Sequence, residues 1–159
     1  MISPSKPSIL YVDDEENNLI SFRAATRKHF VVYTATSAEA AKIVLEKETI
    51  DILVTDQKMP KTKGTELLEF VVEKYPDLVR ILLTGYSDMD SLIIAVQQGH
   101  IFDYIKKPWD IANLVEVLQK AYESKLDTEK LKNEIRNKNE LIESLQNKLK
   151  SIISSSKEL

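Results

Sequence analysis

Five short apolar runs, separated by segments with helical spacing, constrain the fold of this chain more than any other feature. The runs cover residues 9–12, 30–35, 51–55, 80–83 and 102–105. Segments with helical patterns lie between them, and another follows the last run. Strands that alternate with helices in this way form a parallel sheet with helices on both faces. The chain is therefore predicted to have an α/β fold.

The number of runs and the placement of glycine narrow the choice of sheet. Five strands fit the flavodoxin-like order 2-1-3-4-5 better than the six-stranded order of dinucleotide-binding folds. The first glycine after the first run is Gly64, so no phosphate-binding glycine loop follows that run. We therefore expect a doubly wound, flavodoxin-like, five-stranded parallel sheet.

Composition excludes several classes of protein. None of the 159 residues is cysteine, which rules out disulfides, thiolate metal sites and cysteine nucleophiles. No apolar run approaches the roughly 20 residues that a membrane span needs, and the first residues lack the pattern of a signal peptide. We expect a cytoplasmic protein with no membrane association.

The charge distribution argues against direct binding of nucleic acid. The formal net charge is −3, with 14 Lys and Arg against 18 Asp and Glu in residues 1–120, and 8 against 7 in residues 121–159. Neither part has the basic excess that phosphate neutralisation requires. The partners are therefore expected to be proteins.

Polar residues follow the apolar runs at the points where the strands should end. Asp13 and Asp14 follow the first run, Asp56 the third, Thr84 the fourth, and Lys107 comes shortly after the fifth. Ligands of open α/β sheets bind beyond the carboxyl ends of the strands. In the order 2-1-3-4-5 the first and third strands are neighbours, so the three carboxylates should converge.

Three converging carboxylates repel one another unless a cation compensates, and oxygen ligands suit Mg²⁺. Such a site also suits phosphoryl transfer, because the metal and an ammonium can neutralise the phosphoryl oxygens. Asp56 stands alone on its strand and is assigned the nucleophile. Asp13 and Asp14 are assigned to the metal, and Lys107 supplies the ammonium.

The segments ILYVDDEENN, ILVTDQKMP, ILLTGYSD and FDYIKKPW occur in this order. Together they resemble a bacterial two-component response regulator, specifically its receiver (CheY-like) domain, over about residues 7–122. The resemblance implies that Asp56 accepts a phosphoryl group from a phosphohistidine on a sensor histidine kinase or phosphotransfer protein. It implies a signalling protein, with self-catalysed phosphorylation and slow autodephosphorylation, rather than an enzyme that turns over substrate.

The resemblance also assigns a metal-ligand set. It implies that Asp14 and Asp56 bind Mg²⁺ directly and that Asp13 acts largely through water. The backbone carbonyl of Lys58 should complete the protein ligands.

The resemblance further assigns the residues that respond to the phosphoryl group. Lys107 should pair with it, Thr84 should donate its hydroxyl to it, and Tyr104 should move inward behind Thr84 as the second switch residue. The positions that tune dephosphorylation in such sites are occupied here by the bulky Lys58 and Tyr86.

The C-terminal segment carries a heptad pattern. One helix is expected from about residue 110 to 151, and its seam would continue the register of the last receiver helix, including Leu114 and Ala121. The isoleucines at a and leucines at d favour a parallel two-stranded coiled coil, with Lys138 as a polar d residue. A fold-back onto the same chain is the rival interpretation. The coiled-coil seam consists of Leu131, Ile135, Ile142, Leu145, Leu149 and Ile152.

The expected organisation is a receiver domain at 1–122, a coiled-coil helix at 123–153 and a frayed C-terminus at 154–159. The chain would act as a phosphorylation-controlled module that switches an interaction or homodimerisation surface. Three alternatives stay open: a structural coiled-coil scaffold that is not phosphorylated, the N-terminal part of a longer regulator, and an aspartate-nucleophile phosphatase. Lys58 disfavours the phosphatase, because that family has a second acid two residues after its nucleophile.

Overall fold

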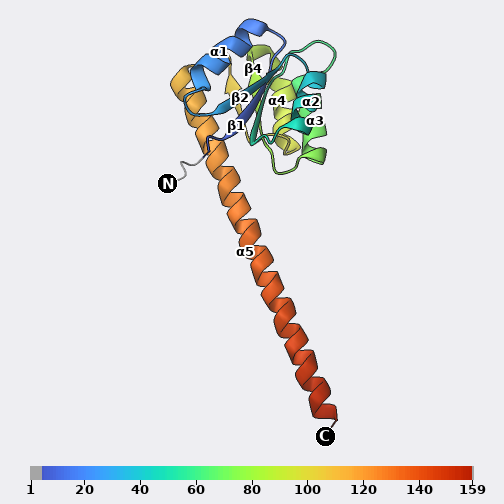
Figure 1. Ribbon diagram of the computed structural model, residues 1–159. Coiled ribbons are helices and arrows are strands. Elements are labelled where there is room, and N and C mark those ends of the chain that lie inside the picture. The colour runs from blue at the N-terminus through green and yellow to red at the C-terminus, as the bar shows by residue number, and fades with distance from the viewer. Residues whose placement is uncertain (1–4, 159) are drawn as a thin grey trace. The chain divides into compact units, whose positions relative to one another are not determined.

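The chain folds into two units, which a computed structural model describes over residues 5–158. The units are Met1–Lys125 and Leu126–Leu159. The regular elements, shown in Figure 1, are β1 (Ser8–Val12), α1 (Glu16–Thr26), β2 (Val31–Ala35), α2 (Ala38–Lys47), β3 (Ile52–Asp56), α3 (Gly64–Lys74), β4 (Val79–Thr84), the 3-10 helix η1 (Tyr86–Asp88), α4 (Met89–Gln97), β5 (Asp103–Lys106) and α5 (Ile111–Lys157).

The first unit is built on one parallel sheet. Its strand order is β2-β1-β3-β4-β5, which confirms the predicted flavodoxin-like topology. Ile9 on β1 pairs with Val32 on β2 and with Ile52 on β3. This register brings the carboxyl ends of β1 and β3 to the same edge of the sheet.

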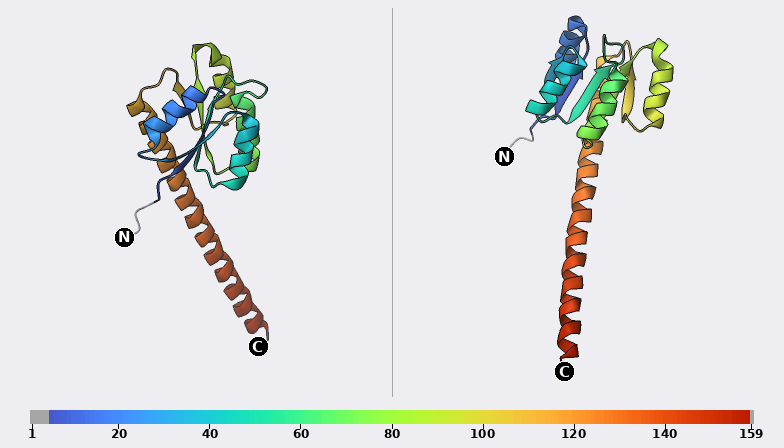
Figure 2. Two further views of the ribbon diagram at one scale, coloured as in Figure 1. Left: turned by 45° about the horizontal axis from the view of Figure 1, so that its top comes forward. Right: turned by 90° about the vertical axis from the view of Figure 1, so that its right-hand side faces the viewer.

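Helices cover both faces of the sheet, as Figures 1 and 2 show. Alternate strand residues point to opposite faces, as the two-residue period of a strand requires. Leu10 and Val12 join the core under α2, α3 and α4. Ile9 and Tyr11 join the core under α1 and the first part of α5. β1 is therefore buried on both sides, as expected for a central strand of a parallel sheet.

Local signals set several helix ends. The hydroxyl of Ser37 accepts a hydrogen bond from the backbone N–H of Ala40 and caps the start of α2. Gly99 follows α4 with a φ of +68°, a left-handed conformation that costs glycine least. Asp110 accepts a hydrogen bond from the N–H of Asn113 at 2.9 Å, which caps α5.

The C-terminal helix departs from the expectation in two ways. It is helical through Lys157, so the predicted end near residue 151 and the frayed segment 154–159 are corrected. No Pro or Gly interrupts the last turns, and the hydroxyl of Ser156 donates to the carbonyl of Ile153 at 2.9 Å. The first unit extends through Lys125 rather than ending at 122, because Lys125 still pairs with Asp51.

The heptad register runs along α5 as one uninterrupted helix, but the first positions in that register have another use. Leu114 and Ala121 are fully buried with the sheet, in the core that α1 shares. They cannot contribute to a coiled coil without leaving that core. We use "tail helix" below for residues 126–157 of α5.

No helix in the described part of the chain has an apolar stretch long enough to cross a lipid bilayer.

Candidate functional site

Three carboxylates meet at the carboxyl edge of the sheet. Asp13 directly follows β1, and Asp56 is the last residue of the neighbouring strand β3. Each of Asp13, Asp14 and Asp56 offers a carboxylate oxygen within 4.8 Å of the others. The parallel pairing of β1 with β3 thus brings together residues more than 40 positions apart in the sequence.

Asp13 is fully buried and held by three neutral donors. The Tyr11 hydroxyl donates to it at 2.6 Å, the Glu15 backbone N–H at 2.9 Å, and the Asn18 amide at 3.1 Å. Burial, and next the hydrogen bond to Asp13, raise the pKa of Tyr11 far above its usual value. Tyr11 therefore stays protonated and orients the Asp13 carboxylate.

Lys107 supplies the counter-charge. Its ammonium lies 2.9 Å from Asp56 Oδ1 and 3.5 Å from Asp13 Oδ2. The backbone positions it, because the Lys107 N–H donates to the carbonyl of Thr84 at the end of β4. Burial alone would lower the pKa of Lys107, but its pairing with Asp56 and Asp13 outweighs burial and raises it. The lysine is therefore a fixed cation at this edge.

Asp56 is affected more by burial than by its partner. Only 7% of the residue is exposed. Burial raises the pKa of Asp56 and outweighs the opposing effect of Lys107, and the nearby Asp13 adds to the rise. The site therefore holds more negative charge than one ammonium can neutralise, which is the electrostatic setting of a cation site.

Asp14 differs from the other two carboxylates because it is exposed to solvent. The cluster is thus open on one side, where water and an incoming group can reach it. Oxygen ligands with room for several waters are what Mg²⁺ requires. The residues present therefore fit a Mg²⁺ ion.

The side chains of the other predicted site residues have their own partners or are exposed. The side chain of Lys58 reaches away from the carboxylates to the Ser87 hydroxyl at 2.6 Å and to Asp88 at 3.9 Å. Thr84 is buried, and its hydroxyl donates to the carbonyl of Gly85. Tyr104 is 37% exposed, so its ring does not lie inside the domain. The side chain of Tyr86 lies outside the described residues.

Gly64 is a site residue that the sequence by itself identifies only as the first glycine of the chain. A Cβ atom at this position would lie 2.3 Å from the backbone oxygen of Asp56, where only glycine fits. The N–H of Gly64 donates to the carbonyl of Gln57, and the Gln57 side chain accepts from the N–H of Thr65. The start of α3 is thereby held against the end of β3. The rarity of glycine, three in the chain, was the one signal for it.

A model of the response regulator receiver domain matches residues 9–119 of the chain. The chain belongs to this family. Receiver domains are the signal-receiving modules of two-component response regulators, and this chain is one of them. The strand order and the acidic edge of the sheet agree with this membership.

Two curated relatives of this receiver domain are named as transcriptional regulators. The hydrogenase transcriptional regulatory protein HoxA of Cupriavidus necator is 33% identical over 123 residues, which cover 77% of this chain and 26% of that protein. The DNA-binding transcriptional regulator NtrC of Proteus hauseri is 34% identical over 117 residues, 73% of this chain and 24% of the regulator. The chain thus spans about a quarter of the length of these relatives.

Solved structures share the fold of this receiver domain. A response regulator receiver domain protein from Clostridium thermocellum is 32% identical with a TM-score of 0.70, covering 75% of this chain and 96% of that one. The signal receiver domain of an HD domain-containing protein from Pseudomonas fluorescens is 28% identical with a TM-score of 0.76, covering 82% and 96%.

Proposed function

We propose that this receiver domain accepts a phosphoryl group on the Asp56 carboxylate and passes the signal on through protein contacts. The observation that carries the proposal is the Lys107 ammonium, 2.9 Å from Asp56 and 3.5 Å from Asp13, at a cluster of three carboxylates. The donor would be the phosphohistidine of a sensor histidine kinase or phosphotransfer protein. The chain would act as a signalling switch rather than as an enzyme that turns over substrate.

Asp14 and Asp56 would bind Mg²⁺ directly, with the Lys58 carbonyl completing the protein ligands and Asp13 acting mainly through water. When bound, the ion would neutralise charge on the phosphoryl oxygens during transfer. The support is the excess of negative charge at the cluster and the solvent exposure of Asp14. The hydrogen bonds of Tyr11 and Asn18 would keep Asp13 from turning away.

The transfer itself would occur at Asp56. A carboxylate oxygen attacks phosphorus, the bond from phosphorus to the donor imidazole nitrogen breaks, and an aspartyl phosphate forms. The imidazole leaves with the electron pair of the broken bond and takes up a proton from solvent. The Lys107 ammonium would then pair with the phosphoryl oxygens, because a phosphoryl group carries more negative charge than the Asp56 carboxylate had.

Thr84 and Tyr104 would transmit the change. Leu82 pairs with Tyr104 between β4 and β5, so Thr84 lies two positions further along the same strand pair. A phosphoryl oxygen on Asp56 would take the Thr84 hydroxyl from the Gly85 carbonyl. The space behind it would admit the Tyr104 ring, which is exposed without phosphorylation. This is a shift between two populations of one fold.

The decisive experiment is phosphorylation by acetyl phosphate in the presence of Mg²⁺, followed by intact-mass measurement. The protein should gain one phosphoryl group, and the gain should disappear with a chelator. Asp56→Asn should not gain it. Asp51→Asn, directly before the start of β3, is the matched control and should be labelled like the unmodified protein. Equal labelling of Asp56→Asn would contradict the assignment.

The tail helix supports a second part of the proposal, homodimerisation. Its seam residues are exposed, for example Leu131 at 58% and Ile152 at 65%, and a lone helix of this kind is marginal in water. Light scattering with and without beryllofluoride, a phosphoryl mimic, tests whether the switch affects pairing. The same molecular mass in both conditions would favour a scaffold that works without phosphorylation.

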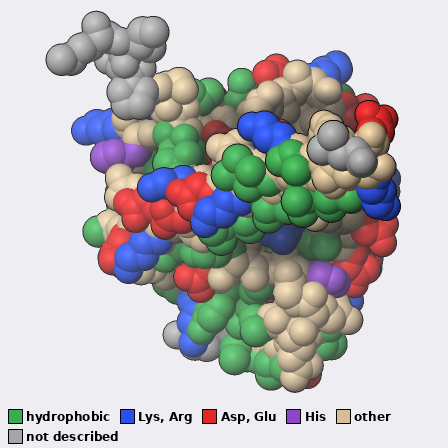
Figure 3. Space-filling view, turned by 90° about the horizontal axis from the view of Figure 1, so that it is seen from below, with side chains coloured by type: hydrophobic (Ala, Val, Ile, Leu, Met, Phe, Trp, Pro, Cys, Tyr) green, Lys and Arg blue, Asp and Glu red, His purple; other side chains and the backbone are tan. Residues whose placement is uncertain are grey.

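The surface charge supports protein partners rather than nucleic acid. On the face seen in Figure 3, Lys and Arg side chains are interspersed with Asp and Glu side chains. With a net charge of −3, the chain offers little counterion release on nucleic acid.

A further inference from the structure

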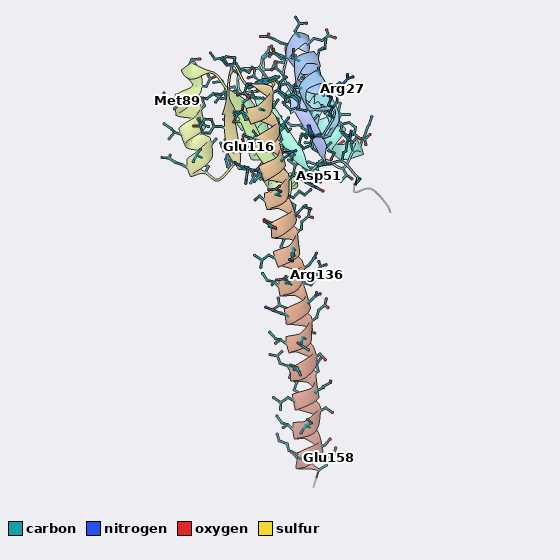
Figure 4. All side chains as sticks on the ribbon, turned by 90° about the vertical axis from the view of Figure 1, so that its left-hand side faces the viewer. Arg27, Asp51, Met89, Glu116, Arg136 and Glu158 are labelled. Atoms are coloured by element: carbon teal, nitrogen blue, oxygen red, sulfur yellow. The ribbon has the colours of Figure 1, made fainter. Side chains whose placement is uncertain are left out.

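The tail helix presents an apolar seam to solvent along its length, and Figure 4 shows its side chains. These apolar side chains can be buried only against a partner. The orientation inferred here rests on the proposed homodimer. The exposed fractions are 58% for Leu131, 51% for Ile135, 52% for Ile142, 55% for Leu145, 58% for Leu149 and 65% for Ile152.

The structure limits where the seam can start. Leu114 and Ala121 are committed to the core of the first unit, and Lys125 is paired with Asp51. The first heptad position beyond these contacts is therefore Thr128. Helical structure through Lys157 makes Ile152 available at the other end.

A parallel, in-register pair would place unfavourable neighbours along this seam. Each seam residue would meet its own counterpart, so two Lys138 ammonium groups would lie side by side at a central d layer. In a parallel pair each g residue also faces the e residue five positions later in the second copy. Asp127 would face Lys132, which is an attractive pair. Glu134 would face Asn139, which is uncharged, so no ion pair forms there.

An antiparallel pair centred on residue 140 removes the like-charge layer, because a positions then pack against d positions. Lys138 would extend over Ile142 of the second copy, with its ammonium free to reach solvent. Each layer forms twice by symmetry. The layers are Thr128 with Ile152, Leu131 with Leu149, Ile135 with Leu145, and Lys138 with Ile142.

The flanking positions agree with this arrangement. Glu134 would face Lys148 of the second copy, and this ion pair would form twice. Leu141, which is 59% exposed, would meet Leu141 of the second copy at the centre. In a parallel pair Glu134 and Lys148 are about 21 Å apart along the axis at ~1.5 Å per residue and never meet.

We propose that the tail helices of two chains pair antiparallel, with residue 140 at the centre of the contact. The two seams then begin at opposite ends, about 36 Å apart at ~1.5 Å per residue. The two receiver domains are attached to opposite ends of the paired helices. Phosphorylation of Asp56 in one receiver would then not depend on contact with the other receiver.

Charge reversal in the 159-residue chain tests the orientation. Glu134→Lys and Lys148→Glu should each raise the dissociation constant of the dimer by about threefold to tenfold. This is the effect expected from the loss of two exposed ion pairs. The double variant should regain the affinity of the unmodified protein, as measured by sedimentation equilibrium. Circular dichroism monitors helix content in all four proteins. Additive weakening in the double variant would overturn the antiparallel pairing.

Cysteine cross-linking gives a second readout, since the chain contains no cysteine of its own. A mixture of Leu131→Cys and Leu149→Cys chains should form the mixed disulfide under mild oxidation, whereas Leu131→Cys alone should not exceed background. Ser151→Cys, at an outward c position in either orientation, defines that background. Efficient self-linking of Leu131→Cys would overturn the proposal.

A 159-residue chain that is monomeric in solution would also overturn the antiparallel pairing. Phosphorylation of Asp56 is measured separately, so loss of the dimer alone would leave the proposed receiver function intact.

Discussion

The Lys125 ammonium lies 2.7 Å from Asp51 Oδ1, at the edge of the sheet opposite the acidic cluster. The second oxygen of Asp51, a residue labelled in Figure 4, accepts from the backbone N–H of Ser8 at 2.8 Å and from its hydroxyl at 3.0 Å. The start of β1, the residue before β3 and helix α5 are thus joined at one carboxylate. This contact anchors α5 where the first unit ends.

Replacing Lys125 should destabilise the fold. Lys125→Met keeps the length of the side chain but leaves Asp51 without its cation. We expect a loss of about 1–3 kcal/mol in the free energy of unfolding, the scale of hydrogen bonds to charged groups. Lys120→Met is the control, because Lys120 is exposed and pairs with Glu116 on the same helix face. Urea unfolding should show little change for it, and equal losses would contradict the anchoring role.

The same carboxylate should make stability depend on pH in acid. Burial tends to raise the pKa of Asp51, but the Lys125 and Ser8 hydrogen bonds outweigh it and lower the pKa. The folded state therefore favours the carboxylate. Its contribution is complete above the unfolded-state pKa of about 4 and is lost as the pH falls through the lower folded-state pKa. Between about pH 5 and pH 3 the unmodified protein should lose more stability than Asp51→Asn. Parallel curves would exclude this linkage.

Asp56 should change the pH dependence of stability in the opposite direction to Asp51. Its raised pKa means that the folded state disfavours the carboxylate, so stability is lost as the pH rises from the unfolded-state pKa through the folded-state pKa. Asp56→Asn should therefore be more stable than the unmodified protein at pH 7 without divalent cations, by about 0.5–2 kcal/mol. The difference should shrink as the pH falls and disappear well below about pH 4, where Asp56 is protonated in both the folded and the unfolded protein.

Adding Mg²⁺ tests whether Asp56 belongs to the ion site. An ion that binds only the folded state raises the melting temperature with its concentration. We expect this rise in the unmodified protein, and a much smaller one in Asp56→Asn. An equal response would mean that Asp56 is not part of the ion site.

Gly64→Ala should damage the fold and the site together. The new Cβ would lie 2.3 Å from a backbone oxygen of Asp56, which cannot rotate away. We expect a loss of about 1–3 kcal/mol in the free energy of unfolding, typical of overpacking, with slower phosphorylation. At Gly85 an added Cβ would meet only Asp88 Oδ2, at 3.9 Å. Gly85→Ala should therefore unfold like the unmodified protein, and similar losses for both would refute the steric explanation.

Tyr11→Phe should weaken Mg²⁺ binding without removing it. The substitution deletes the 2.6 Å hydrogen bond to Asp13 but keeps the ring stacked on Phe22 at 4.1 Å. Asp13 retains the Glu15 and Asn18 donors, so we expect a stability loss of about 1–2 kcal/mol and a modest fall in Mg²⁺ affinity by calorimetry. Unchanged affinity would mean that Tyr11 serves packing alone.

The sheet could be predicted because its signals are local. Residues 9–12 and 52–54 are apolar at every position, and a polar residue follows each run. The strand order then places Asp13 beside Asp56 without any knowledge of side-chain contacts. Family membership confirms the interpretation of the combined motifs.

Contacts between distant segments could not be read in this way. Lys58 was assigned through its backbone carbonyl, but its side chain turns to Ser87, 29 positions away. Tyr11 looks like a core aromatic in sequence, and only the fold places its hydroxyl on Asp13. The heptad pattern likewise does not show where the buried part of α5, with Leu114 and Ala121, ends and the exposed seam begins.

The order of residue types along the chain determined the α/β class, the acidic edge of the sheet and the long C-terminal helix, since the period of apolar side chains acts over a few neighbours. The tertiary structure alone decided that Gly64 must lack a side chain, that Lys125 anchors α5 to Asp51, and where the seam of the tail helix starts. Hydrogen bonds and van der Waals contacts act over only a few ångströms, so which groups meet depends on strand register and helix packing across segments far apart in sequence.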